Sequence, residues 1–305
     1  MLILLFLTLS ASFFLNTGLA RLALQRNWCD PPGAAKIHTR PIPFTGGIGI
    51  FLTWSGTLLI LSLFFPAIPL PLLLIPAITA LTVGTCDDFY WKSRTVPGLK
   101  LLLQSLVALL IVLLVSHRTP LSITGNLVFV LLAFNAFNLA DGLDGLAGGE
   151  ALISFLGLSL VFATSRRYDL LLPLLLLTAT LAGFLILNLQ RPTRLFLGDG
   201  GSHLIGAIFA TFALTLLSST RTPLPRDLWT TIALLLLLGA PLLDLIWVTV
   251  RRLYLRRPIL ASDRNHLYDL LAKTSLGPLR TVLVFWLCHF LFVFTGITML
   301  LLEVR

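Results

Sequence analysis

Apolar residues follow one another along this chain in long, continuous runs. Ten of these runs are close to the roughly 20 residues that a helix needs to cross a bilayer. They are expected at 2–20, 45–65, 69–86, 99–115, 120–138, 147–163, 169–188, 202–218, 228–250 and 281–302. A transmembrane barrel is excluded, because its strands alternate apolar and polar residues. The pattern predicts an all-α polytopic membrane protein of about ten spans, with residues 1–305 forming a single integral-membrane domain.

Composition agrees with the apolar pattern. Only 11% of the 305 residues are charged and 57% are hydrophobic, whereas soluble proteins carry about 25% charged residues. This excludes an ordinary soluble enzyme and a disordered chain. The net charge of +9 is attributed to the bias of basic residues toward cytoplasmic loops, so no nucleic-acid partner is expected. Three separate cysteines indicate neither a disulfide framework nor a metal-binding cysteine motif.

The basic residues are divided unevenly between the two sets of loops. Sixteen of the 22 Lys and Arg residues fall in the loops 21–41, 87–100, 139–146, 189–201 and 251–280. The positive-inside rule therefore places these five loops in the cytoplasm and both termini outside. Ten of the 13 acidic residues lie on or beside the same side. Carboxylates beside apolar spans are costly and usually functional.

Three short motifs carry five of these ten carboxylates. Asp87 and Asp88 end the third run, and Lys100 and Gln104 share a helical face four residues apart. Asn135, Asn138, Asp141 and Asp144 recur every three residues before a glycine-rich stretch. Asp199 lies in the turn Gly198–Gly201, which opens the eighth run, and Asn188 ends the run before it. A glycine-rich turn at a helix start favours an anion or, with Asp199, a bound cation.

Two further loops on the same side add basic groups. The loop after the ninth run holds Arg264 and His266, which we expect to face an anionic ligand, and Asp244 lies near the end of that run. The first loop leads through His38 and Arg40 to a glycine pair at Gly46–Gly47. Carboxylates without a Cys/His set favour Mg²⁺ or Mn²⁺, and the nearby Lys and Arg favour phosphate groups. The sequence therefore predicts metal-assisted phosphoryl transfer between a lipid phosphate and a soluble nucleotide-like diphosphate.

At these motifs the chain resembles the polyprenyl-phosphate N-acetylhexosamine-1-phosphate transferases, glycosyltransferase family 4. The resemblance covers roughly residues 36–271. It includes Asp87-Asp88 with Pro97, Lys100 and Gln104, the run Asn-x-x-Asn-x-x-Asp-Gly-x-Asp-Gly-Leu at 135–146, and Phe-Leu-Gly-Asp-x-Gly-Ser at 196–202. Pro241 to Asp244 and the stretch Asp-Arg-x-His-Leu at 263–267 resemble the fifth cytoplasmic segment of that family.

The resemblance implies a reaction and a set of roles. A UDP-sugar and undecaprenyl phosphate would react with Mg²⁺ to give a polyprenyl-diphosphate sugar and UMP, which starts a lipid-linked cell-surface glycan. Asp87 would act as base on the lipid phosphate with the support of Asp88, and Asp199, Asn138 and Asp88 would hold the metal. Lys100 and Asn138 would hold the pyrophosphate, and Asp141 and Asp144 the nucleotide. Asn188, Arg264 and His266 would complete the substrate site.

The chain departs from the family at one segment. The family pattern His-x-His-His is replaced by His266-Leu-Tyr268-Asp269. This favours the GlcNAc branch of O-antigen and teichoic-type enzymes over the alternative, the phospho-N-acetylmuramoyl-pentapeptide transferase of peptidoglycan synthesis. The sequence also leaves open an inactive homologue, an ion-binding transporter, a homodimer, and either a direct displacement or a covalent aspartyl intermediate.

Overall fold

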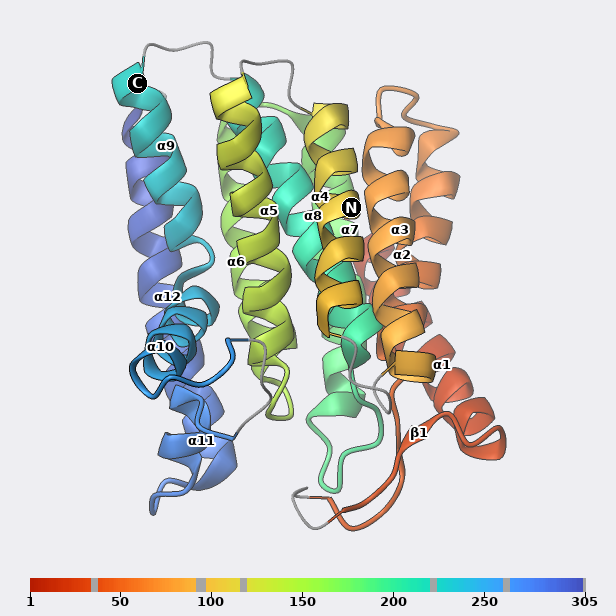
Figure 1. The fold of residues 1–305 in the computed structure, drawn as a ribbon. Coiled ribbons are helices and arrows are strands. Elements are labelled where there is room, and N and C mark those ends of the chain that lie inside the picture. The colour runs from red at the N-terminus through yellow and green to blue at the C-terminus, as the bar shows by residue number, and fades with distance from the viewer. Residues whose placement is uncertain (34–37, 92–96, 116–119, 220–223, 260–263, 304–305) are drawn as a thin grey trace.

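A computed structural model describes residues 1–33, 38–91, 97–115, 120–219, 224–259 and 264–303 (Figure 1). The described chain is almost entirely helical. Its helices are α1 (Leu2–Gln25), α2 (Gly46–Ser62), α3 (Leu70–Cys86), α4 (Pro97–Val115), α5 (Pro120–Ala140), α6 (Leu146–Thr164), α7 (Tyr168–Asn188), α8 (Gly198–Ser219), α9 (Leu224–Leu236), α10 (Gly239–Tyr254), α11 (Leu267–Ala272) and α12 (Gly277–Glu303). The prediction of an all-α polytopic membrane protein is confirmed.

Eight of the predicted spans are single helices long and apolar enough to cross a membrane within the described ranges: α1, α3, α4, α5, α6, α7, α8 and α12. The second predicted span, α2, is shorter at 17 residues, whereas α3 continues through a π-helical turn and its helical stretch runs from Leu70 to Tyr90. The helices stand side by side with α8 inside the bundle (Figure 1). In the apolar window of α8, 89% of the residues are buried, against 17% for α1. The helix that carries Asp199 is therefore the core of the protein, and α1 is peripheral.

The prediction of one continuous span at 228–250 is wrong. The chain bends by 88° between α9 and α10. In Figure 1, α9 stands upright, whereas α10 is seen nearly end-on at the lower left of the bundle. Gly239 adopts a positive φ of +22° at the break, and Pro241 has no backbone N–H for a continuing helix. Ser154 Oγ donates to the carbonyl of Leu237 at 2.8 Å, and the N–H of Ala240 donates to His289 Nδ1 at 3.3 Å. Backbone groups left open by the bend thus find partners inside the bundle.

The loops that the basic residues group together gather at one end of the bundle, the lower end in Figure 1. Two short strands, β1 (Cys29–Asp30) and β2 (Ile42–Pro43), pair there in antiparallel fashion. The N–H groups of Gly46 and Gly47 then donate to the carbonyls of Phe196 and Leu197 at 3.1 and 3.0 Å. The first loop is thereby attached to the segment that leads into α8, which brings the predicted functional loops together.

Candidate active site

Four polar side chains from four segments meet at the lower end of the bundle. Asp87 lies in a π-helical turn, Asp87–Trp91, that continues α3, Lys100 in α4, Asn138 in α5 and Asp199 in the first turn of α8. Lys100 Nζ contacts Asp87 Oδ2 at 2.6 Å and Asp199 Oδ2 at 3.1 Å. Asn138 Nδ2 donates to Asp199 Oδ1 at 2.8 Å. We call these four residues the Lys100 cluster.

A glycine explains why the two acidic motifs approach so closely. A Cβ added at Gly84 of α3 would lie 2.2 Å from the carbonyl oxygen of Asp199, so α3 and the start of α8 are in backbone contact. The same approach lets Asp88 Oδ2 accept the N–H of Gly200 at 3.0 Å. Asp88 therefore lies beside the Lys100 cluster and is attached to the helix start that presents Asp199. This N–H is one of those that a helix start leaves without an intrahelical partner.

A buried network supports the cluster from inside the bundle. Gln104 Nε2 donates to His203 Nε2 at 2.8 Å, and His203 Nδ1 donates to the carbonyl oxygen of Asp199 at 2.6 Å. These two contacts require the neutral histidine with its proton on Nδ1. The predicted shared face of Lys100 and Gln104 is confirmed, because both side chains reach α8. His203 was not among the residues predicted from the sequence, although it follows Asp199 by four residues on one helical face.

The cluster opens into a cavity of about 500 Å³. Its wall includes Asn138 and Asp199 from the cluster, together with other predicted site residues, which are Asp141, Asp144, Asn188 and Arg264. The predicted substrate-binding residues of four separate segments therefore surround one space. A transporter site would be expected near the bilayer midplane, whereas this cavity lies at the end of the bundle.

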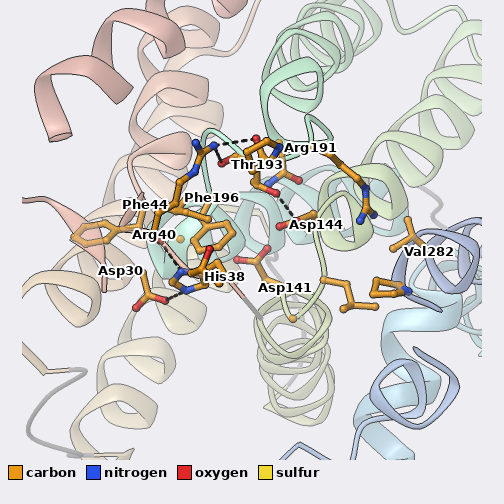
Figure 2. Close-up of a pocket in the computed structure, with 18 of the residues that line it drawn as sticks. Asp30, His38, Arg40, Phe44, Asp141, Asp144, Arg191, Thr193, Phe196 and Val282 are labelled. Atoms are coloured by element: carbon orange, nitrogen blue, oxygen red, sulfur yellow. Dashed lines mark hydrogen bonds and ion pairs between the residues drawn. The ribbon is translucent and has the colours of Figure 1, made fainter. Parts of the chain in front are cut away.

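One side of the cavity is formed by the first loop, whose residues have no site role in the sequence predictions (Figure 2). Asp30 Oδ2 contacts His38 Nε2 at 3.1 Å, and the His38 ring lies edge-on to Phe196 with 5.4 Å between centroids. Arg40 donates to the carbonyls of Pro192 and Thr193, both at 3.2 Å. The basic stretch at His38 and Arg40 was a visible signal, but the pairing with Asp30 was not.

Asp144 and Asn188 are held by the loop between α7 and α8. Thr193 Oγ1 donates a hydrogen bond to Asp144 Oδ2 (Figure 2). Burial raises the pKa of Asp144, against the lowering effects of Thr193, Arg191 and His38. Asn188 Oδ1 accepts the N–H of Gly145 at 2.6 Å, and its Nδ2 donates to the carbonyl of Leu195 at 2.8 Å. Asn188 thus joins the two loops, and its amide is occupied by backbone partners.

His266 does not line the cavity. Its Nδ1 contacts Asp244 Oδ2 at 2.6 Å, and the two side chains are only 7% and 2% exposed. Asp244 Oδ1 also accepts the N–H of Leu267 at 2.6 Å. The structure therefore places Arg264 at the cavity wall and turns His266 toward α10. Asp263, part of the same motif, lies outside the described residues.

The donor set fits a divalent cation held jointly with a substrate. Within the described part of the chain, no group of three His, Cys, Asp or Glu side chains is arranged to hold a metal ion. The Lys100 cluster instead offers the carboxylates of Asp87 and Asp199 and the amide oxygen of Asn138. Mg²⁺ is usually bound through one or two carboxylates together with substrate phosphates and water. Asp88, the third predicted metal ligand, lies next to this set.

Comparison with known proteins identifies the family. Residues 70–217 match the family described as Glycosyl transferase family 4. The chain is 30% identical to the probable undecaprenyl-phosphate N-acetylglucosaminyl 1-phosphate transferase of Bacillus subtilis, over 92% of this chain and 79% of the relative. It is 31% identical to the undecaprenyl-phosphate alpha-N-acetylglucosaminyl 1-phosphate transferase of Thermotoga maritima, over 90% and 82%. The Escherichia coli K12 protein of the same name is 26% identical over 81% and 69%. The chain therefore belongs to glycosyl transferase family 4 and is an enzyme of the glycosyl-1-phosphate transferase class.

Proposed function

We propose that this enzyme transfers GlcNAc-1-phosphate from UDP-GlcNAc to undecaprenyl phosphate and so starts a lipid-linked cell-surface glycan. An oxygen of the lipid phosphate would form a bond to the phosphorus that carries the sugar. The bond from that phosphorus to the UMP oxygen would break, and UMP would leave. The names of the relatives support this acceptor and this sugar.

The observation that carries the proposal is the Lys100 cluster. Lys100 balances the charge of one of its two carboxylates, so with Asp88 nearby the ionised site keeps a net negative charge. Such a site attracts a divalent cation, and a diphosphate would follow because the bound cation and Lys100 offset its charge. Asp199 and Asn138 reach the cavity wall, where a soluble donor has access.

The protein residues divide the work between the two substrates. Asp87, in contact with Lys100, would take any proton from the lipid phosphate and orient it. Lys100 and Asn138 would hold the diphosphate, and Asp141 and Asp144, further along the cavity, would bind the nucleotide. Arg264 at the cavity wall would contact the donor, whereas His266 would act on it through the loop that it fixes.

Mg²⁺, or Mn²⁺ in its place, is the proposed cofactor. It would be held by Asp199, Asn138 and Asp88, and it would supply charge neutralisation at the phosphoryl oxygens. We place the active site at the cytoplasmic face of a bacterial inner membrane. The basis is the excess of Lys and Arg in the loops that surround the cavity.

Product formation tests the proposal directly. Purified protein would be incubated with Mg²⁺, undecaprenyl phosphate and a panel of UDP-sugars that includes UDP-GlcNAc and UDP-MurNAc-pentapeptide. We expect UMP and a lipid-linked sugar with UDP-GlcNAc, and loss of both on chelation. Turnover of the pentapeptide substrate alone would overturn the choice of donor, and no product with any sugar would overturn the function.

Substitution of the clustered carboxylates gives the first mutational prediction. Asp87→Asn and Asp199→Asn should each lower turnover by at least about 100-fold, the scale expected for loss of one transition-state contact. Asp169→Asn is the matched control, because Asp169 pairs with Arg167 at 2.9 Å at the start of α7, away from the cavity. Full activity in either cluster variant would remove the proposed role of that residue.

A further inference from the structure

Tyr268 lies in the segment where the chain departs from the histidine pattern of its family. It has no assigned role in the proposed reaction. The residue belongs to α11 and is only 4% exposed. Its hydroxyl donates to the carbonyl oxygen of Leu139 at 2.8 Å. Leu139 lies in the last turn of α5, where carbonyls have no intrahelical partner. One residue before Leu139 is Asn138 of the Lys100 cluster, and two residues after it is Asp141.

The tyrosine also meets the turn that follows α5. A Cβ added at Gly142 would lie 2.1 Å from the Tyr268 hydroxyl oxygen and 2.5 Å from the ring carbon that bears it. The backbone of the turn therefore lies directly against the phenol. Only glycine fits this approach without moving one of the two. Asp141, Gly142 and Asp144 of the same turn line the cavity.

The phenol ring is itself fixed from behind. It stacks on His266 with 4.9 Å between centroids and an angle of 17° between planes, and Phe285 of α12 meets its edge at 6.3 Å. His266 is held in turn by Asp244 of α10. Burial raises the pKa of Tyr268 well above its usual value, and nearby Asp269, Asp244 and Asp141 act in the same direction. The hydroxyl therefore remains a proton donor at working pH.

We propose that Tyr268 is a positioning residue for donor binding: its hydroxyl fixes the end of α5 and the turn after it, and thereby places Asn138 and Asp141 at the cavity. The inference rests on the proposed function only for the identity of the donor. The C-terminal part of the chain thus sets the geometry of a motif about 130 positions earlier. Tyr268 itself does not line the cavity, so its effect reaches the donor through the turn.

Steady-state kinetics of Tyr268→Phe test this role. Loss of one buried hydrogen bond should raise the KM for the UDP-sugar by about 5- to 10-fold. The KM for undecaprenyl phosphate and the kcat should change by less than about twofold. Tyr254→Phe is the matched control, because Tyr254 is 85% exposed at the end of α10. A lower melting temperature with an unchanged donor KM would overturn the inference and leave Tyr268 a purely structural residue.

Gly142→Ala sharpens the test. The added methyl group should push the phenol away and give the same rise in donor KM. Tyr268→Phe should then add little in the Gly142→Ala background, because the hydroxyl contact has already been lost. Independent, multiplied effects in the double variant would contradict the proposed contact.

Hydrogen exchange decides the inference even if the donor is wrong. Peptides that span 139–146 in the full-length protein should exchange faster in Tyr268→Phe than in the wild type, and at the wild-type rate in Tyr254→Phe. If the wild type turns over no UDP-sugar, the proposed function fails, but faster exchange still supports the positioning role. Turnover with wild-type donor KM and wild-type exchange in Tyr268→Phe removes the inference and leaves the proposed function standing.

Discussion

The Lys100 cluster and the Asp244–His266 pair are built from similar groups but are used in different ways. Both bring a carboxylate against a nitrogen at 2.6 Å. In the cluster, Asp87, Lys100 and Asp199 have side chains that are 12%, 21% and 20% exposed. Asp244 is 2% exposed, and its two carboxylate oxygens contact His266 Nδ1 and the N–H of Leu267 at the start of α11. Side-chain exposure, more than residue type, separates a group available for chemistry from a group that fixes a loop.

Among the changes that test this comparison, removal of Lys100 should have the largest effect. Lys100→Met keeps the length of the side chain but leaves Asp87 and Asp199 facing one another without a cation, so each disfavours ionisation of the other. We expect turnover to fall by about 100-fold or more, as measured by UMP release at saturating substrates. The melting temperature should change little, because the cluster is partly exposed.

The conservative variant Lys100→Arg separates charge from position. It should retain more turnover than Lys100→Met, although the guanidinium cannot occupy the same point between the two carboxylates. Wild-type turnover in Lys100→Met would show that the lysine has no part in the reaction and that the cluster is as structural as the Asp244–His266 pair.

Asp244→Asn should lower stability more than turnover, which is the reverse of the result expected for Lys100→Met. The asparagine amide can still accept the N–H of Leu267, but the charged contact with His266 is lost. We expect a loss of about 1–3 kcal/mol in the free energy of unfolding, measured by thermal or denaturant unfolding in detergent. Turnover should fall by about 10-fold or less, through the loop that carries Arg264. Abolished turnover with unchanged stability would place Asp244 with the catalytic groups and break the comparison.

The smallest expected effect concerns Asp144, which lines the cavity and accepts a hydrogen bond from Thr193. Its pKa is raised in the folded protein, mainly by burial. The stability that it contributes is therefore fully present below the ordinary pKa of an aspartate, and is lost as the pH rises through the folded pKa. Asp144→Asn cannot ionise and should lack this loss. Relative to the wild type, its melting temperature should rise as the pH is raised above the ordinary pKa of an aspartate, by roughly 1–3 °C.

A pH series of thermal unfolding for the two proteins measures this difference. A melting-temperature difference that falls as the pH rises would contradict the raised pKa of Asp144. Thr193→Val offers a second comparison, because it removes the hydroxyl that donates to Asp144. The ionised carboxylate would then lose a stabilising partner, so the pH dependence should become steeper than in the wild type.

Much of the fold was predictable because a bilayer demands a simple pattern. Apolar runs of the right length became helices, and basic residues marked the end of the bundle at which the loops meet. The run at 228–250 was misread, since Gly239 and Pro241 are compatible with a span by composition. Whether a helix continues through them depends on partners for the broken backbone, and these come from Ser154 and His289 on other helices.

In the active site, too, some features could be predicted from the sequence and others could not. Asp87, Lys100, Asn138 and Asp199 could be chosen from sequence because charged and amide groups are costly beside a bilayer, and their spacing showed shared helical faces. Their contact with one another could not, because it depends on close packing at Gly84. Thr193 and Tyr268 carried no sequence signal of their own roles, since each role is defined by a partner that is distant in the chain. His203 and Asp30 contact Asp199 and His38, which are four and eight residues away, but the sequence does not show that these groups meet.

By itself, the sequence determined the membrane-spanning helical architecture, the end of the bundle at which the polar loops gather and the acidic and basic groups that lie there, because these follow from local composition and from the cost of charge in lipid. Only the tertiary structure decided which of these groups meet. It opened Asp199 to the cavity, closed Asp244 into a pair with His266, and placed Tyr268 against Gly142. The physical reason is that such contacts arise between helices, where the fit of small and large side chains sets distances that no local pattern records.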